Sequence, residues 1–256
     1  MGILNVTPDS FSDGGKFFSA EKAVDHALAM ADEGADFIDV GGESTRPGSE
    51  PLPLDEELRR VVPVIEKLSK KISLPISIDT YKSSVAEAAL SVGATLVNDV
   101  SGLTFDGAMV QTIARHRASV VIMHIKGTPR TMQQNPQYEN VVTEVATFLA
   151  TQAQKAHTAG IEQIIVDPGI GFGKTLQHNL QLMRNLHEIA NLGFPLLVGP
   201  SRKSFIGTIL DLPTDERLEG TAAAVTTCIL NGAHIVRVHD VKEMKRVAKV
   251  ADALKN

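Results

Sequence analysis

The chain has 256 residues, of which 43% are hydrophobic and 21% charged, and a net charge of −5. This composition is typical of a folded globular protein and excludes collagen-like, disulfide-rich and intrinsically disordered chains. The mild acidity argues against nucleic acid as the main partner. No apolar run reaches the ~18 residues that a membrane span needs, and the single Cys228 cannot form an internal disulfide. We therefore expect a cytoplasmic protein without nucleic-acid or membrane partners.

Short apolar runs recur along the chain, and most of them follow a glycine that can end a helix. The predicted strands lie, in chain order, within residues 2–5, 34–40, 75–79, 93–99, 119–124, 160–167, 193–199 and 232–240. A glycine just past a helix supplies a left-handed cap at little steric cost. The runs are continuously apolar, which is typical of strands buried on both faces. The intervening segments have helical spacing, as in residues 58–72 and 241–254.

Strands and helices alternate along the whole chain, which predicts an α/β protein with a parallel sheet and right-handed crossovers. About eight such units in about 250 residues favour a closed (β/α)8 TIM barrel over the alternative, an open doubly wound sheet. No linker or composition shift divides the chain, so we expect a single domain over residues 1–256. A TIM barrel carries its active site at the carboxyl ends of its strands.

Nearly every predicted strand ends in a polar or ionisable side chain. These strand ends carry Asn5, Asp39, Asp79, Asn98, Asp99, Met123, His124, Asp167, Ser201, Arg202, Lys203, Arg237 and His239. Any single one of them is as easily explained as a helix cap or turn residue. A whole set in register converges on one mouth, which capping alone does not explain. We therefore expect the functional site there.

Three long polar connections follow strands, over residues 6–18, 41–53 and 126–138. Long ordered loops on a rigid barrel usually shape a substrate site, although mobile surface decoration is the alternative. A fourth loop, residues 167–175 (DPGIGFGKT), lacks the glycine spacing of a P-loop and of a dinucleotide-binding fingerprint. We interpret it as a glycine-rich loop whose backbone closely approaches a flat ligand, with Phe172 covering that ligand.

Two cationic positions face the predicted mouth. Arg237 and His239 are two residues apart on the last strand, so they point the same way and suit phosphate oxygens. The alternative is a surface salt bridge of this pair with Asp240 or Glu243. Metal-ligand spacing among the histidines is absent, and no nucleophile–base triad is recognisable. Covalent catalysis is therefore disfavoured, and Cys228 reads as a buried small hydrophobe.

Several of these segments together resemble the dihydropteroate synthase family. The resemblance lies in residues 5–15 (NVTPDSFSDGG), 41–48 (GGESTRPG), 167–174 (DPGIGFGK), 201–204 (SRKS) and 237–240 (RVHD). It extends along essentially the whole chain and keeps the order of the family. One departure is that only Met1 precedes the first strand, where family members usually have further residues. We therefore expect the first strand or the barrel floor to be incomplete.

The resemblance implies a transferase of folate biosynthesis that joins a dihydropterin-methyl diphosphate to p-aminobenzoate. It assigns the pterin ring to Asp79, Asn98, Asp167, Met123 and Phe172, and the p-aminobenzoate pocket to Thr45, Pro47, Phe172, Ser201 and Lys203. It assigns the diphosphate to Arg46, Arg237 and His239, with Asn5 reaching an associated Mg²⁺. The residues expected to act in catalysis are Asp79, Asp167, Lys203 and Arg237. The resemblance also implies a homodimer that sulfonamides inhibit.

Two other functions remain open from the residues alone. A methyltetrahydrofolate-binding methyltransferase could use the same pterin-binding set, but it should lack the 5–15 loop and the 201–203 motif. A barrel that only binds pterin would have no need for a phosphate-binding set. Both features are present in this chain, which favours the synthase.

Overall fold

The computed structural model describes residues 1–6 and 16–255, except for the side chains of residues 16–19. Its described strands are β1 (Gly2–Asn5), β2 (Ile38–Gly41), β3 (Ile76–Asp79), β4 (Leu96–Asp99), β5 (Ser119–Met123), β6 (Ile164–Asp167), β7 (Leu197–Val198) and β8 (Ile235–Val236). The described helices are α1 (Lys16–Asp32), α2 (Leu54–Ser69), α3 (Ser83–Ser91), α4 (Met109–His116), α5 (Val141–Thr158), α6 (Leu176–Arg184), α7 (Leu186–Ala190), α8 (Ser204–Leu210), the 3-10 turn η2 (Thr214–Glu216), α9 (Leu218–Leu230) and α10 (Val241–Lys255). Each predicted strand segment thus overlaps one observed strand, and only β2 extends beyond its segment, by one residue.

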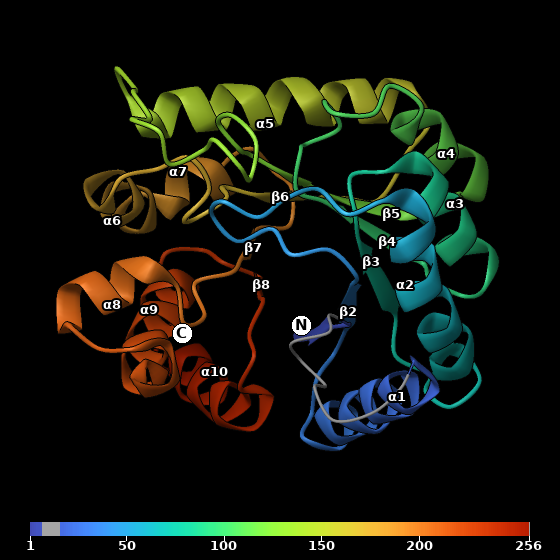
Figure 1. Ribbon diagram of the computed structural model, residues 1–256. Helices are drawn as coiled ribbons and strands as arrows, with labels where there is room; N and C mark the ends of the chain where they lie inside the picture. The colour runs from blue at the N-terminus through green and yellow to red at the C-terminus, as the bar shows by residue number, and fades with distance from the viewer. Residues whose placement is uncertain (7–15, 256) are drawn as a thin grey trace.

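The strands close into a barrel with the helices outside it (Figure 1). Strands β1 to β6 pair in sequence order, all parallel, and β7 pairs with β8. Parallel bridges between Val166 and Leu196 and between Gly2 and Val238 join the two sheets at both seams. The predicted (β/α)8 TIM barrel is confirmed, and the open sheet is excluded.

The expectation of an incomplete first strand is wrong. Gly2 N donates to Phe37 O at 2.9 Å, and Ile3 N donates to Val238 O at 3.0 Å, so β1 is bonded on both sides. The amino group of Met1 donates to Val236 O at 2.9 Å. The floor of the barrel does contain a cavity of about 280 Å³, which borders Met1 and α10.

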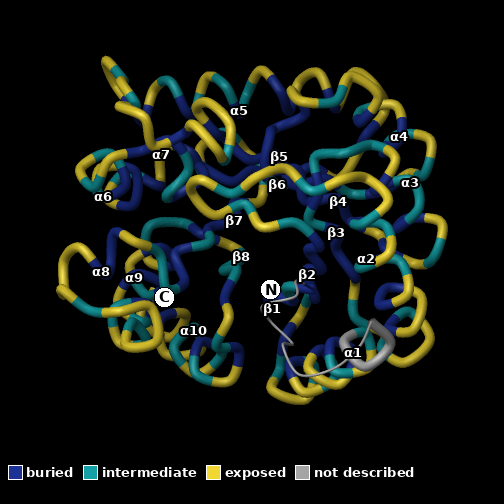
Figure 2. Tube along the Cα trace, in the orientation of Figure 1, coloured by how far each residue is buried: buried dark blue, intermediate teal, exposed yellow. Residues whose placement is uncertain are grey.

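The apolar residues form two layers that follow from the two-residue period of a strand. Side chains facing outward pack under the helices in the main core, whose strands are buried while the outer helix faces are exposed (Figure 2). Side chains facing inward form a separate cluster of Met1, Leu96, Val121 and Leu197, with Phe37, Ile165 and Ile235 packed against it. Two residues further along the same chain segments, and therefore facing inward as well, lie Asn98, Met123, Asp167 and Arg237. An apolar floor thus supports a polar layer at the carboxyl ends of the strands.

Candidate active site

A pocket of about 60 Å³ opens at the carboxyl ends of the strands. It is lined by Ile3, Thr45, Asp79, Asn98, Val100, Met123, Asp167, Phe172, Gly199, Ser201, Lys203, Arg237 and His239. The lining includes every residue predicted to contact substrate except Arg46 and Pro47, which are exposed on the loop that carries Thr45. The predicted convergence of distant strand ends on one mouth is therefore confirmed. The predicted 6–18 loop falls for the most part outside the described residues.

Two aspartates hold the Arg237 guanidinium inside the barrel. Arg237 Nε donates to Asp39 Oδ2 at 2.6 Å, and Nη2 donates to Asp79 Oδ2 at 2.7 Å. Asn98 Nδ2 also donates to Asp39 Oδ2, at 3.0 Å. The alternative of a surface salt bridge with Asp240 or Glu243 is wrong for Arg237, because its partners are interior carboxylates.

Asp39 is a member of this network for which the sequence predicts no role. Its side chain is fully buried, and it joins the arginine to the amide of Asn98. The signal was present, since Asp39 belongs to the polar strand ends, but nothing in the sequence pairs it with a residue 198 positions away. It organises two pocket residues without lining the pocket itself.

Two carboxylate oxygens in this network have no partner within the described part of the chain. They are Asp39 Oδ1 and Asp79 Oδ1, both buried. Burial raises the pKa of Asp79, and the attraction of Arg237 opposes this. A buried acceptor without a donor is costly, so the Asp79 oxygen suits a ligand that brings an N–H group.

Asp167 ends β6 and also lines the pocket. Its Oδ1 accepts a hydrogen bond from Gly169 N at 2.7 Å, and burial raises the pKa of the carboxyl. The loop that follows folds over the end of β5. A Cβ at Gly169 or Gly173, both with φ near +65°, would overlap the carbonyl oxygens of His124 and Lys126. Gly169 and Gly173 are thus required by close approach to the chain itself, and the approach of this loop to a ligand stays a prediction.

A buried lysine fixes the same loop from behind. Lys174 is 2% exposed, and its Nζ lies 2.9 Å from both His124 Nδ1 and the carbonyl oxygen of Phe172. Burial lowers the pKa of Lys174 well below its usual range and lowers that of His124 to about 3. The pair therefore holds the backbone of Phe172 at the pocket. The motif containing Lys174 contributes to the resemblance, but it predicts no role for this lysine.

Lys203 reaches over the glycine-rich loop from the start of α8. Its Nζ lies 4.3 Å from the centre of the Phe172 ring and donates to the carbonyl oxygen of Ile170. Burial lowers the pKa of Lys203 to about 8, against the attraction of Asp167. A cation over an aromatic face is a favourable contact that also sets the ring's position.

Two adjacent side-chain pairs join the loops after β7 and β8. Ser201 Oγ lies 2.9 Å from His239 Nδ1 and accepts from the backbone N of His239 at 3.2 Å. Arg202 donates to both oxygens of Asp240, at 2.8 and 2.6 Å. When the Ser201 hydroxyl donates its hydrogen bond to Nδ1, a neutral His239 carries its own proton on Nε2. The Nε2–H group is then the donor that can reach a ligand.

Cations gather around His239 as predicted. Burial lowers the pKa of this histidine to about 4, and the charges of Arg237, Arg202 and Arg46 add to that effect. Arg46 thus acts electrostatically on the same histidine as Arg237, although it does not line the pocket. These side chains can hold an anion at one side of the mouth.

The donor set for a metal is small. Among the described residues no group of three His, Cys, Asp or Glu side chains could hold a metal ion. Asn5 ends β1 in register with Gly41, which in turn is in register with Asp79. One amide oxygen fits an ion bound mostly by phosphate oxygens and water. Along the described chain no helix is long and apolar enough to cross a membrane.

Comparison with known proteins agrees with this geometry. The family described as "Pterin binding enzyme" matches residues 1–239. A dihydropteroate synthase of Synechocystis sp. is 52% identical over 99% of this chain and 89% of its own. The Yersinia pestis synthase with a sulfonamide drug has a TM-score of 0.94 at 42% identity, over 100% of this chain and 93% of that one. The Xanthomonas albilineans synthase with 7,8-dihydropteroate has a TM-score of 0.89 at 41% identity, over 100% of this chain and 92% of that one. The chain therefore belongs to the dihydropteroate synthase family of pterin-binding enzymes, which are transferases of folate biosynthesis.

Proposed function

We propose that the pocket binds (7,8-dihydropterin-6-yl)methyl diphosphate and p-aminobenzoate and joins them into 7,8-dihydropteroate with release of diphosphate. The observation that carries this proposal is that one pocket is lined by two carboxylates, Asp79 and Asp167, and by three basic side chains, Lys203, Arg237 and His239. We refer to the first set as the acidic wall and to the second as the cationic rim. A flat heterocycle with an anionic leaving group needs both sets.

The acidic wall suits the aminopyrimidinone edge of the pterin. Asp79 Oδ1 and the carboxylate of Asp167 can accept from its N–H groups. Because Asp39 uses the amide nitrogen of Asn98, the amide oxygen of Asn98 is a further acceptor. Such a site rejects analogues lacking these donors, since its own polar groups would remain unpaired. Met123 and Phe172, which belong to one apolar cluster, can sandwich the ring.

The p-aminobenzoate side is formed by Thr45, Phe172, Ser201 and Lys203, with Pro47 beside Thr45 on the same loop. Lys203 can pair with the carboxylate of this substrate while its aliphatic stem covers the aromatic ring. The bound sulfonamide of the Yersinia pestis relative supports the same use here, because a sulfonamide has the shape of p-aminobenzoate. We expect sulfonamides to inhibit this protein by competing for that side.

The diphosphate belongs at the cationic rim, near His239, Arg46 and Arg237. Nε2–H of His239 can donate to a phosphate oxygen. Asn5 would hold Mg²⁺ together with phosphate oxygens, and the ion would neutralise charge on the leaving group. Arg237 has a second task, since its two ion pairs also hold Asp39 and Asp79 in place.

The reaction needs no strong general base. The carbon–oxygen bond breaks first, diphosphate takes the electron pair, and a pterin-methyl cation remains. The neutral arylamine then attacks the cation, forms the carbon–nitrogen bond and loses one proton. Asp79 and Asp167 stabilise the positive charge through their carboxylates. Preorganised charges, and not a covalent intermediate, supply the catalysis.

We also propose a homodimer in the cytoplasm. Val250 and Leu254 lie one helical turn apart on α10 and are more than half exposed, and an exposed apolar helix face supports self-association. The single Cys228 is a buried free thiol, in agreement with a reducing compartment.

A diphosphate-release assay tests the proposed function. Release that requires both substrates supports the synthase. Binding of pterin without release would favour a pure binder, and methyl transfer from methyltetrahydrofolate would favour the methyltransferase. Absence of release in the presence of both substrates and Mg²⁺ overturns the proposal.

A further inference from the structure

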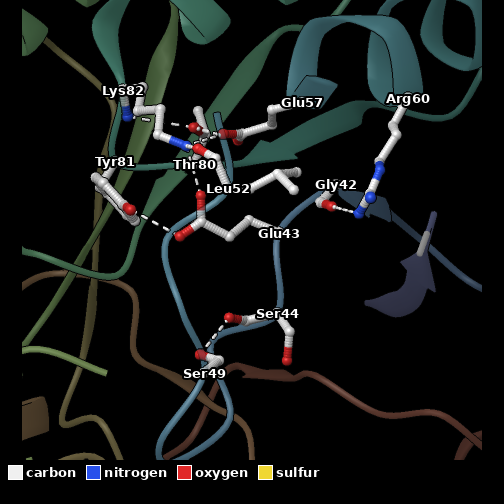
Figure 3. A network of polar contacts seen from close by, with 10 residues as sticks. All are labelled: Gly42, Glu43, Ser44, Ser49, Leu52, Glu57, Arg60, Thr80, Tyr81 and Lys82. Atoms are coloured by element: carbon white, nitrogen blue, oxygen red, sulfur yellow. Dashed lines mark hydrogen bonds and ion pairs between the residues drawn. The ribbon is translucent and has the colours of Figure 1, made fainter. Parts of the chain in front are cut away.

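Lys82 ties together the two ends of the loop that carries Thr45 (Figure 3). Its Nζ donates to Glu43 Oε2 at 2.5 Å, to the carbonyl oxygen of Leu52 at 2.6 Å and to Glu57 Oε2 at 2.6 Å. Glu43 stands at the start of the loop and Leu52 at its end, and Glu57 lies on α2. One ammonium group therefore closes the loop. We call Glu43, Glu57 and Lys82 the clasp.

The clasp is buried and charged, so its geometry is demanding. The side chains of Glu57, Glu43 and Lys82 are 1%, 8% and 19% exposed. Burial raises the pKa of Glu57, and its bonds to Lys82 oppose that rise. Burial also opposes the charge of Lys82, but the bonds to Glu43 and Glu57 outweigh it and raise its pKa. Two carboxylates thus share one cation out of water, and losing the cation leaves both uncompensated.

Neighbouring hydroxyl groups complete the coordination. Tyr81 Oη donates to Glu43 Oε1 at 2.7 Å, and Thr80 Oγ1 donates to Glu57 Oε1 at 2.8 Å. Thr80 and Tyr81 follow β3 directly, beside the pocket residue Asp79. The clasp therefore attaches the loop to the same strand end that carries an acidic pocket residue.

No member of the clasp lines the pocket, but the loop it closes supplies Thr45. Within that loop, Ser49 Oγ donates to the carbonyl oxygen of Ser44 at 2.6 Å and Ser49 N donates to Arg46 O at 3.1 Å. The loop is thus braced internally around Thr45 and Arg46 and fixed to the barrel at its base. A shift at the base moves the whole braced segment.

We infer that Lys82 is a positioning residue for the p-aminobenzoate side of the site. It acts by holding the Thr45 loop at a fixed height over the pocket. This inference rests on the proposed function, and it separates the two substrates. The pterin-side residues Asp79, Asn98 and Asp167 belong to strands that are paired within the sheet, whereas Thr45 belongs to the loop that the clasp closes. Loss of the clasp should therefore weaken the aminobenzoate side selectively.

The test compares Lys82→Met, Lys82→Arg and a control, Lys70→Met, in the full-length enzyme. Lys70 also pairs with a glutamate, Glu66, but it is 70% exposed and directly follows the end of α2. For Lys82→Met we expect the KM for p-aminobenzoate to rise at least about tenfold, because displaced contacts are costly. The affinity for bare dihydropterin, measured by calorimetry, should stay within about twofold. In Lys82→Arg the KM for p-aminobenzoate should stay close to the wild-type value, because a guanidinium can bond both carboxylates.

Because Lys82→Met leaves two carboxylates buried, Glu43→Gln is the second variant. It keeps the Lys82–Glu57 pair and removes only the charge that faces the loop, so it should give the same selectivity with a smaller loss of melting temperature. Equal loss for both substrates, or a lower melting temperature with unchanged KM values, overturns the inference. A wild-type enzyme that releases no diphosphate would instead defeat the proposed function, so the two failures are distinguishable.

Discussion

Asp39 on β2 and Arg237 after β8 form a buried ion pair inside the barrel, with Nε of the arginine 2.6 Å from Oδ2 of the aspartate. The same oxygen accepts from Asn98, so one atom orients two pocket residues. This shared acceptor does not itself line the pocket. A residue that does not line the pocket should therefore control ligand binding.

We predict that Asp39→Asn lowers the free energy of unfolding by about 3 kcal/mol, because Arg237 loses one of its two buried partners. It should also weaken pterin binding, since Asn98 loses the acceptor that orients its amide. Denaturation with urea and calorimetry with a dihydropterin measure the two effects. Asp36→Asn is the control, because Asp36 is 69% exposed in its pair with Lys245 and should cost at most about 1 kcal/mol. Similar losses in both variants would contradict this role.

Asp167 has a counterpart that makes its test specific. Asp99 also ends a strand, is buried, and accepts from the backbone N of the residue two positions on, Ser101, at 2.7 Å. It does not line the pocket. We predict that Asp167→Asn weakens dihydropterin binding about a hundredfold, because an amide replaces a charged acceptor. Asp99→Asn should lower stability but leave that affinity unchanged. A comparable loss of affinity in both variants would assign Asp167 to the fold alone.

Arg46 allows a cleaner test of the diphosphate site than Arg237. Arg237→Ala would also release Asp39 and Asp79, so bare pterin would be affected as well. Arg46 is exposed and does not line the pocket. We predict that Arg46→Ala raises the KM for the pterin diphosphate about tenfold and spares bare dihydropterin, as expected for one charged hydrogen bond. Arg115→Ala removes an exposed arginine from the last turn of α4, where it pairs with Glu87, and serves as the control. Equal effects on both ligands would exclude a phosphate role for Arg46.

The sequence predicts the barrel and its mouth because both follow from short-range rules. Glycines after helices and a two-residue period place Asp79, Asn98, Asp167 and Arg237 above an inward apolar layer. Those rules say which way a side chain points and at which end it lies. They are sufficient to select most of the pocket lining.

The partners within the site could not be predicted from the same rules. Glu57 lies in a helix turn with Asp55 and Glu56 and gives no sign that it alone is buried against Lys82. Arg237 reads as a free cation at a strand end, and only the closed barrel brings Asp39 and Asp79 to it. The glycines of residues 167–175 permit a close approach, but the sequence does not say that the approaching atoms belong to His124 and Lys126, just after β5. Each of these facts depends on packing between segments that are distant in the chain.

The charge of Lys203 sets a pH limit on the reaction. Burial lowers its pKa to about 8, so the ammonium is present below that pH and is lost as the pH rises through it. Because the proposed pairing with the aminobenzoate carboxylate needs the ammonium, kcat/KM for p-aminobenzoate should fall above pH 8. A rate profile from pH 6 to 10 measures this limb, since kcat/KM follows ionisation of the free enzyme. In Lys203→Arg the cation persists over this whole range, so the residual activity should lose the alkaline limb. An unchanged limb in that variant would show that a different group titrates.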